Sequence, residues 1–144
     1  MREIKFRAWD NVDFKMYYTG EENNIHFYFD STTIIAERFK DIYVDTPEGD
    51  RYPDVGYEKL EHLKYMQYTG LKDKNGKEIF EGDIVERNVL AFGEVRTFIG
   101  QVKMFECAWW IDTESAAVPL WDEMHELKII GNIYENPELL EEAK

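Results

Sequence analysis

The chain contains a single cysteine, Cys107, among 144 residues, so an internal disulfide is excluded. This cysteine usage suits a reducing compartment, and we expect a cytoplasmic protein. Long apolar runs are also missing, so no membrane-spanning helix is predicted. The first residues, Met1–Lys5, mix both charges and lead into no apolar run, so no secretory signal is predicted either.

Basic residues are scarce. The 17 Lys and Arg residues stand against 30 Asp and Glu, which leaves a net charge of −13. Residues 21–62 and 91–144 each hold eleven acidic and four basic groups, whereas the other segments are nearly neutral. Clustered Lys and Arg supply most of the non-specific affinity for nucleic acids, so this balance argues against a nucleic-acid-binding protein. The acidic surface either serves solubility or imitates a polyanion in the basic site of a nucleic-acid-binding protein.

Motifs for phosphate and metal binding are incomplete. The segment Gly70–Lys77 resembles a phosphate-binding loop, but its second glycine is one place too late and Glu78 stands where Ser or Thr is needed. His125-Glu126 resembles the start of a zinc-protease helix, but Ile129 occupies the position of the second histidine. The three histidines, His26, His62 and His125, lie far apart with no cysteine at ligand spacing. We therefore predict no metal site and no cofactor.

Catalytic residues are not identifiable either. Cys107 would become a nucleophile only if folding placed it beside a base such as His125. A lone cysteine close to Trp109 in an apolar strand is more often a buried small hydrophobe, and we expect that here. The abundance of carboxylates makes any one pair uninformative as an acid-base couple. We assign no catalytic residue.

Aromatic residues, by contrast, are plentiful at 15%, and short apolar runs recur, which favours β-strands in a chain of single-domain length. We expect one mostly β domain over residues 1–144, with an N-terminal β region at 1–62 and a barrel-like portion at 63–144. Strands are predicted at 4–9, 16–18, 25–29, 84–90, 95–105, 107–111 and 127–134. In the first of these, Ile4, Phe6 and Ala8 would form the buried face. A helix would place Ile34, Ile35, Arg38 and Phe39 on one face, whereas residues 32–35 suit a strand equally well.

Turn and cap signals complete this pattern. Residues 43–57 are rich in Pro, Gly and Asp and are predicted to form a mobile loop, followed by a short helix at Leu60–Leu63. Asn136 before Pro137 and Glu138 predicts a short C-terminal helix, because Asn caps free N–H groups and Pro suits the first helical position.

The segment Asp73–Gly76 predicts a hairpin whose register follows from charge. A two-residue loop would place Lys74 opposite Lys77 and Asp73 opposite Glu78, which sets like charges together. A three-residue loop instead pairs Asp73 with Lys77, Lys72 with Glu78 and Leu71 with Ile79. We therefore expect the three-residue loop, with Gly76 in the left-handed region. Gly82-Asp83 predicts a second turn.

Five segments form a distinctive set: Ile4-Lys5-Phe6-Arg7-Ala8-Trp9, Tyr68-Thr69-Gly70-Leu71, Asp73-Lys74-Asn75-Gly76, Glu81-Gly82-Asp83-Ile84-Val85 and Ile130-Gly131-Asn132-Ile133-Tyr134-Glu135-Asn136. Together they resemble the YopX family of phage and prophage proteins, at both ends of the chain. The resemblance implies a small, mostly β protein with an SH3-like barrel or roll, encoded by a phage or prophage and without an established activity. Residues 21–62 carry little of the pattern, so their fold and role stay open.

Tryptophans supply the candidate interface. Adjacent residues of a strand point to opposite faces, so Trp109 and Trp110 cannot both enter one core. The outward ring, with Trp121 and with Trp9 as an alternative contributor, is a candidate for a partner or subunit contact. Alternatively, the segment around Pro119-Leu120 folds over that ring.

We expect a non-catalytic accessory protein in the cytoplasm of a bacterial host cell. It would bind a macromolecular partner, a host or phage protein, with its acidic surface as one candidate contact, and self-association is expected as well. An enzyme acting on a small or nucleotide-like substrate and a nucleic-acid-binding barrel are the competing classes.

Overall fold

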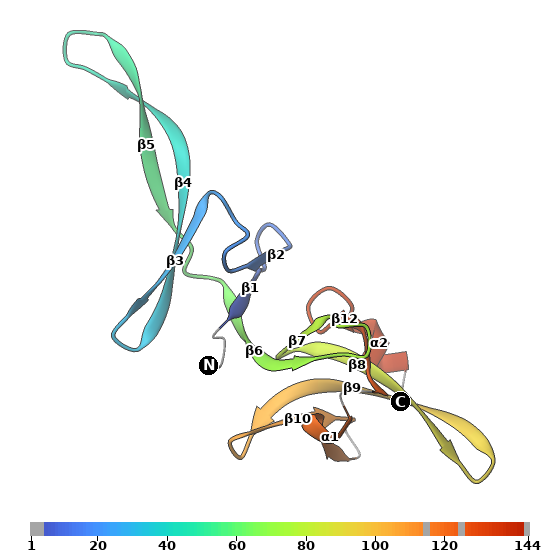
Figure 1. Cartoon of the computed structure of the whole chain (residues 1–144). Coiled ribbons are helices and arrows are strands. Elements are labelled where there is room, and N and C mark those ends of the chain that lie inside the picture. The colour runs from blue at the N-terminus through green and yellow to red at the C-terminus, as the bar shows by residue number, and fades with distance from the viewer. Residues whose placement is uncertain (1–4, 114–115, 124–125, 143–144) are drawn as a thin grey trace. The chain divides into compact units, whose positions relative to one another are not determined.

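The computed structural model describes residues 5–113, 116–123 and 126–142 (Figure 1). Its strands are β1 (Phe6–Asp10), β2 (Lys15–Tyr18), β3 (Ile25–Asp30), β4 (Thr33–Asp45), β5 (Arg51–Lys59), β6 (Lys64–Lys72), β7 (Glu78–Phe80), β8 (Asp83–Ala91), β9 (Glu94–Phe105), β10 (Ala108–Asp112), β11 (Ala117–Pro119) and β12 (Lys128–Asn132). Its helices are α1 (Leu120–Glu123) and α2 (Glu138–Glu142). The predicted mostly β fold with a short C-terminal helix is confirmed. None of these helices has the length and apolarity needed to cross a membrane.

The chain divides into two compact units. Unit 1 comprises the N-terminal residues up to Arg7 together with Met66–Lys144, and unit 2 comprises Ala8–Tyr65. The sequence-based division between residues 62 and 63 therefore lies close to the border of the units, but it does not anticipate that the N-terminus belongs to unit 1.

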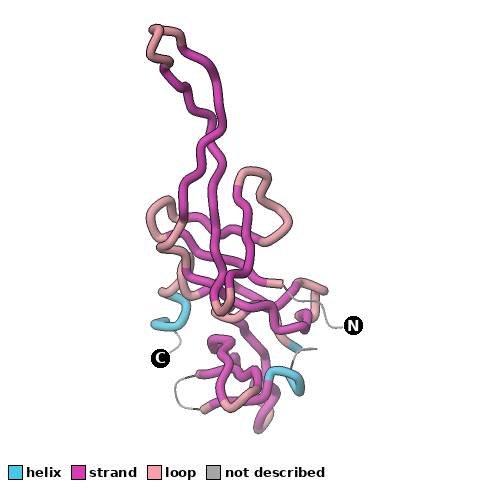
Figure 2. Tube along the Cα trace, turned by 90° about the vertical axis from the view of Figure 1, so that its left-hand side faces the viewer, coloured by secondary structure: helices cyan, strands magenta, loops and turns pink. Residues whose placement is uncertain are grey.

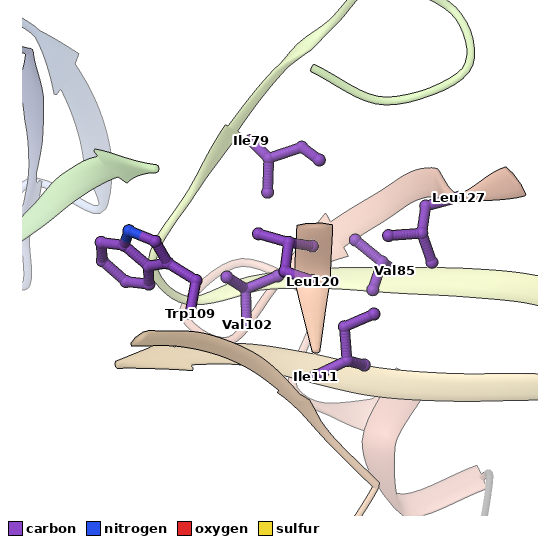
Figure 3. Close-up of a cluster of buried hydrophobic side chains, with 7 residues drawn as sticks. All are labelled: Ile79, Val85, Val102, Trp109, Ile111, Leu120 and Leu127. Atoms are coloured by element: carbon purple, nitrogen blue, oxygen red, sulfur yellow. The ribbon is translucent and has the colours of Figure 1, made fainter. Parts of the chain in front are cut away.

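Unit 1 is built on a five-stranded sheet in the order β11-β10-β9-β8-β12, in which all neighbours are antiparallel. The sheet curls around a core of seven buried side chains (Figure 3): Ile79, Val85, Val102, Trp109, Ile111, Leu120 and Leu127. Each such side chain stabilises the fold by about 1.5–3 kcal/mol relative to exposure. This arrangement agrees with the expected barrel or roll.

The hairpin between β6 and β7 has the predicted three-residue loop. The Asp73 N–H donates to the Lys77 carbonyl at 2.8 Å, Lys72 lies opposite Glu78, and Gly76 has a φ of 81°. The Asp73 carboxylate also accepts from the Asn75 and Lys77 N–H groups, at 2.9 Å each. The predicted pairing of Leu71 with Ile79 does not form, because a bulge interrupts the ladder there. Both side chains nevertheless pack in the unit 1 core.

Unit 2 contains β2 beside β1 and a second sheet in the order β3-β4-β5. Its core consists of six buried side chains: Ala8, Tyr17, Ile25, Ala36, Leu60 and Leu63. Of the undecided residues 32–35, all but Thr32 belong to strand β4, and Thr32 lies in the turn before it. The helix predicted at Leu60–Leu63 is wrong: this segment is irregular, and its two leucines are buried under the sheet.

The loop predicted over residues 43–57 is also wrong. β4 and β5 form a continuous antiparallel ribbon from Glu37 opposite Lys59 to Asp45 opposite Arg51. The turn residues Pro47 and Gly49 lie in the short connection at its tip, and Pro53 lies within β5. Gly56 leaves room for the Ile42 side chain, since a Cβ there would lie 3.0 Å from Ile42 Cγ2. Both residue types are therefore compatible with a ribbon here, because Pro53 lies on an edge strand and Gly56 leaves room for a side chain of the neighbouring strand.

Strand β1 departs from the predicted alternation. Arg7, Ala8, Trp9 and Asp10 are all buried, so β1 has no solvent face over these residues. Arg7 is buried because its guanidinium meets the Asp83 carboxylate, with Nη2 donating to Oδ1 at 2.8 Å.

At the C-terminus, α2 begins after Asn136, but the capping mechanism differs from the prediction. The Asn136 side-chain oxygen accepts from the Asn132 N–H, at 3.3 Å. The Leu139 N–H donates to the Asn136 main-chain carbonyl, at 3.1 Å.

Candidate functional site

Three aromatic side chains meet at the outer face of unit 1, and we call Phe105, Trp110 and Trp121 the aromatic surface. The Phe105 and Trp110 rings are stacked, with centroids 5.1 Å apart and planes 10° from parallel. Trp121 meets Trp110 edge to face, with a centroid distance of 5.9 Å and an angle of 69°. Phe105 remains 39% exposed and Trp121 48% exposed. The Trp110 indole N–H is satisfied by the Phe105 carbonyl at 3.0 Å, so the rings present mainly carbon to solvent.

The β9–β10 hairpin positions this surface. Phe105 and Ala108 are the last paired residues, and Glu106 and Cys107 form a two-residue turn with φ values of 50° and 61°. This tight reversal brings Trp110 back beside Phe105. Cys107 is exposed in that turn, so the expectation that it is a buried hydrophobe is wrong.

Neighbouring residues decide which rings face outward. Trp109 points into the core and is 6% exposed, which leaves Trp110 on the opposite face of β10. Trp121 follows Leu120, which is fully buried and anchors α1 on the same core. An ion pair between Lys103 and Asp112, at 2.8 Å, adds charged groups to the two strands that carry Trp110 and Phe105.

Of the four tryptophans predicted as a candidate interface, the structure brings together Trp110 and Trp121. Trp109 is a core residue, and Trp9 is buried in unit 2, so neither contributes to the aromatic surface. Sequence reasoning missed Phe105, although the predicted end of a strand at 105 and the start of the next at 107 already implied a tight turn. His125 lies outside the described residues, so no pairing with Cys107 is described.

Unit 2 holds a buried polar network around Asp10. The Asp10 carboxylate is fully buried and accepts from the Val12 and Asp13 N–H groups, at 2.9 and 3.1 Å. It also accepts from the Tyr17 hydroxyl at 2.9 Å and bonds to His62 Nε2 at 2.7 Å. Burial alone would raise the pKa of Asp10, but these hydrogen bonds together lower it to about 2.

Arg38 completes this network. Its Nη2 donates to the Tyr17 hydroxyl oxygen at 2.9 Å and lies 3.5 Å from Asp10 Oδ2. Burial and the neighbouring Asp10 raise the pKa of Tyr17 to about 12. The network therefore ties the β1–β2 turn to β4 and to the segment that holds His62.

A carboxylate that orients a histidine is also the arrangement found behind many general bases. His62 is one-third exposed, so it is accessible to a small molecule. No sequence signal predicted this pair, because the two residues lie 52 positions apart. Among the described residues, no cluster of three or more His, Cys, Asp or Glu side chains could hold a metal ion.

Each unit contains a cavity lined by described residues. The one in unit 1, of about 70 Å³, is bounded mainly by apolar side chains of the core and by Arg87. The one in unit 2, of about 470 Å³, is lined by residues of β4 and by the segment Lys59–Tyr65. Its ionisable lining groups are Lys59, Glu61 and the phenol of Tyr65. Neither cavity includes the Asp10–His62 pair.

Solved structures with the same architecture are known. A crystal structure of protein EF1440 from Enterococcus faecalis is 28% identical and superposes with a TM-score of 0.63, covering 97% of this chain and 99% of that one. The fold is shared with protein yopX from Bacillus subtilis, which is 20% identical with a TM-score of 0.61, over 94% and 95% of the two chains. A search of curated proteins found no match. A family model described as YopX protein matches residues 5–141, and the chain therefore belongs to the YopX family.

Proposed function

We propose that the protein is a non-catalytic binding module that holds another protein on its aromatic surface. The observation that carries this proposal is the stack of Phe105 on Trp110 with Trp121 packed edge to face against it, two of these rings being more than one-third exposed. Trp rings are the commonest anchors of protein interfaces, because they lose a large area to a partner while their own conformation is already restricted.

The charge of the chain supports a partner of a particular kind. With a net charge of −13, the protein is attracted to basic surfaces, and electrostatic complementarity raises association rates. The partner we propose is a host or phage protein with an apolar pocket and a basic rim. We extend the proposal to a phage or prophage accessory role in the bacterial cytoplasm, as the resemblance of the sequence to the YopX family implies. Self-association through the aromatic rings is part of the same proposal.

Affinity capture from a bacterial lysate with the full-length tagged chain tests this function. We expect a saturable protein partner that is retained by the wild type and lost from Trp121→Ala. Phe92→Ala is the matched control, because Phe92 is an exposed aromatic of the same unit, in the β8–β9 turn. A partner captured equally by all three proteins contradicts the assignment to the aromatic surface.

The Asp10–His62 pair favours a second candidate, an enzyme acting on a small or nucleotide-like substrate. The test is turnover of a panel of nucleotides and phosphate esters by the wild type and by His62→Gln. Turnover that His62→Gln abolishes without a change in thermal stability would favour the enzyme. The third class, a nucleic-acid-binding barrel, requires binding that weakens steeply with salt.

A further inference from the structure

Strand β4 extends well beyond the end of its neighbour β3. It pairs with β3 from Thr33 to Arg38, and beyond that point it pairs only with β5 (Figure 1). The two strands continue past β3 as a twisted ribbon (Figure 2). Two-stranded ribbons are marginally stable in water, because each strand has one edge without a hydrogen-bonding partner. The outer edge of β4 beyond β3 is therefore a place where another strand could bind.

The ladder bonds identify which groups form this edge. The Thr46 N–H donates to the Asp50 carbonyl, so even-numbered residues of β4 bond to β5 and odd-numbered residues face away. Phe39 is the last residue to bond on the far side, with its N–H donating to the Asn24 carbonyl at 2.8 Å. From Asp41 to Asp45 no strand of the described chain pairs with that side.

The two edges of the ribbon are not equivalent. In β5, Pro53 lies on the outward-facing register, directly opposite Tyr43, and it has no N–H to offer. Proline is one of the devices by which proteins prevent edge strands from pairing. The segment Phe39–Asp45 of β4 contains no proline. The edge of β4 is thus left open, whereas the edge of β5 is blocked.

The side chains on the open register alternate acid, aromatic, acid. Asp41, Tyr43 and Asp45 point to one face of the ribbon, and Tyr43 is 67% exposed. On the same face lie the cross-strand neighbours Val55 and Tyr57, which are 50% and 66% exposed. Arg51, directly opposite Asp45, already forms an exposed ion pair with it at 2.9 Å, whereas no ion pair with Asp41 is found among the described residues. A strand added beside β4 would place its own alternate side chains next to this row.

We propose that the Asp41–Asp45 edge binds an extended segment of a partner protein as an additional strand. The segment has a basic residue at its first and fifth positions and an apolar residue at the third. One basic residue pairs with Asp41, the other shares the exposed Asp45 carboxylate with Arg51, and the apolar residue packs on Tyr43. Main-chain hydrogen bonds supply affinity in this mode of recognition, and the alternate side chains supply specificity. This inference concerns unit 2 and does not depend on the aromatic surface.

Charge excludes a second copy of the same edge as the occupant. Two β4 edges paired antiparallel about Tyr43 would place Asp41 directly opposite Asp45, twice. Like charges in direct cross-strand pairs are destabilising, so the acidic row that attracts a basic segment also prevents self-pairing.

A titration of the isotope-labelled full-length protein, followed by NMR, tests the proposal. The probe is a seven-residue peptide with Lys at the second and sixth positions, Val at the fourth and Thr elsewhere. We expect saturable shifts of the Asp41, Tyr43 and Asp45 amide signals. A peptide with Glu in place of both Lys residues should cause none. Shifts at this edge that depend on protein concentration without peptide would indicate a second copy and overturn the proposal.

Two variants separate the contributions of charge and main chain. Asp41→Lys with Asp45→Lys should weaken peptide binding about tenfold or more, because both pairs with the peptide become repulsive and the Asp45–Arg51 ion pair at the edge is lost. Asp50→Lys with Asp54→Lys makes the same change in net charge away from the row and should leave binding within about twofold. Tyr43→Pro removes an outward N–H while sparing the bonds to β5, and it should abolish the shifts at the edge. Equal binding by the wild type and by the first double variant contradicts the proposal.

Discussion

Arg7 and Asp83 form an ion pair in the interior of unit 1, although 76 positions separate them in the chain. Arg7 Nη2 donates to Asp83 Oδ1 at 2.8 Å, and the two side chains are only 4% and 3% exposed. Asp83 Oδ2 accepts from the Phe80 N–H, and Arg7 lies over the Phe80 ring, 4.9 Å from its centroid. The pair therefore holds β1 against the turn that connects β7 to β8.

Replacing Arg7 should strongly destabilise unit 1. In Arg7→Met the Asp83 carboxylate loses its counter-charge in a site where burial already raises its pKa, and we expect a loss of about 3–5 kcal/mol. The double variant Arg7→Met with Asp83→Asn removes the isolated charge and keeps an acceptor for Phe80, so it should recover more than about 1 kcal/mol. Urea unfolding at neutral pH measures both. A double variant less stable than Arg7→Met would contradict this account.

Acid should weaken unit 2 through Asp10. Its pKa is about 2 in the folded protein against an ordinary value of 3.8, so the ionised carboxylate contributes about 2.5 kcal/mol above pH ~4. That contribution disappears as the pH falls from about 4 to about 2. The difference in unfolding free energy between wild type and Asp10→Asn should therefore shrink over this range. A difference that stays constant with pH would count against the network.

Tyr17→Phe gives a second measure of the same network. It removes one donor to Asp10, so the pKa of Asp10 should move toward its ordinary value, and the acid-dependent loss of stability should be smaller and complete at a higher pH. In the wild type, the raised pKa of Tyr17 predicts a loss of stability as the pH rises from about 10 to about 12. Tyr17→Phe should abolish that alkaline loss.

The β9–β10 turn should be open to stabilisation. Glu106 and Cys107 both adopt positive φ, which costs residues with a Cβ about 1–2 kcal/mol each. Asn-Gly is the preferred pair for such a turn, so Glu106→Asn with Cys107→Gly should raise the unfolding free energy by about 1 kcal/mol. Ala108→Gly, in the adjoining strand, should lower it. Thermal unfolding distinguishes the two directions, and a destabilised double variant would contradict the turn assignment.

The tryptophans should differ sharply in their effect on stability. Trp109→Ala empties part of the unit 1 core and should cost about 3–5 kcal/mol. Trp121→Ala removes a half-exposed ring and should cost about 1 kcal/mol or less. Chemical denaturation measures this contrast. Similar losses for both variants would mean that Trp121 is a core residue and would weaken its assignment to a binding surface.

Much of the fold could be predicted because its signals are local. The register of the β6–β7 hairpin followed from charges four to six residues apart and from the left-handed glycine at Gly76, and the structure has that register next to the turn, up to the bulge that displaces Leu71 from Ile79. Four strands of the five-stranded sheet, β8, β9, β10 and β12, followed from short apolar runs in the same way, whereas β11 was not predicted. The ribbon at 43–57 was mistaken for a loop, because Pro53 and Gly56 break a central strand but are tolerated on an edge.

The candidate surface was only half predictable. The pleat of a strand requires Trp109 and Trp110 to point to opposite faces of the sheet, but the sequence does not show which of the two faces the core. Leu120 and Val102 decide this, since they pack on the Trp109 side. Phe105 joins Trp110 only because the two-residue turn reverses the chain between them.

The amino-acid sequence by itself determined the β class, the turns and the alternation of side chains, since these depend on residues close together in the chain. Tertiary structure decided which polar groups are buried and paired. Arg7 and Asp83 are separated by 76 positions, and the buried Asp83 charge meets its counter-charge only because the fold brings Arg7 to it. Asp10 receives hydrogen bonds from Val12, Asp13 and Tyr17 nearby in the chain, and the fold adds His62 from 52 positions away. The tertiary structure also decided which part of β4 has no neighbouring strand on its outer side, because β3 ends before β4 does.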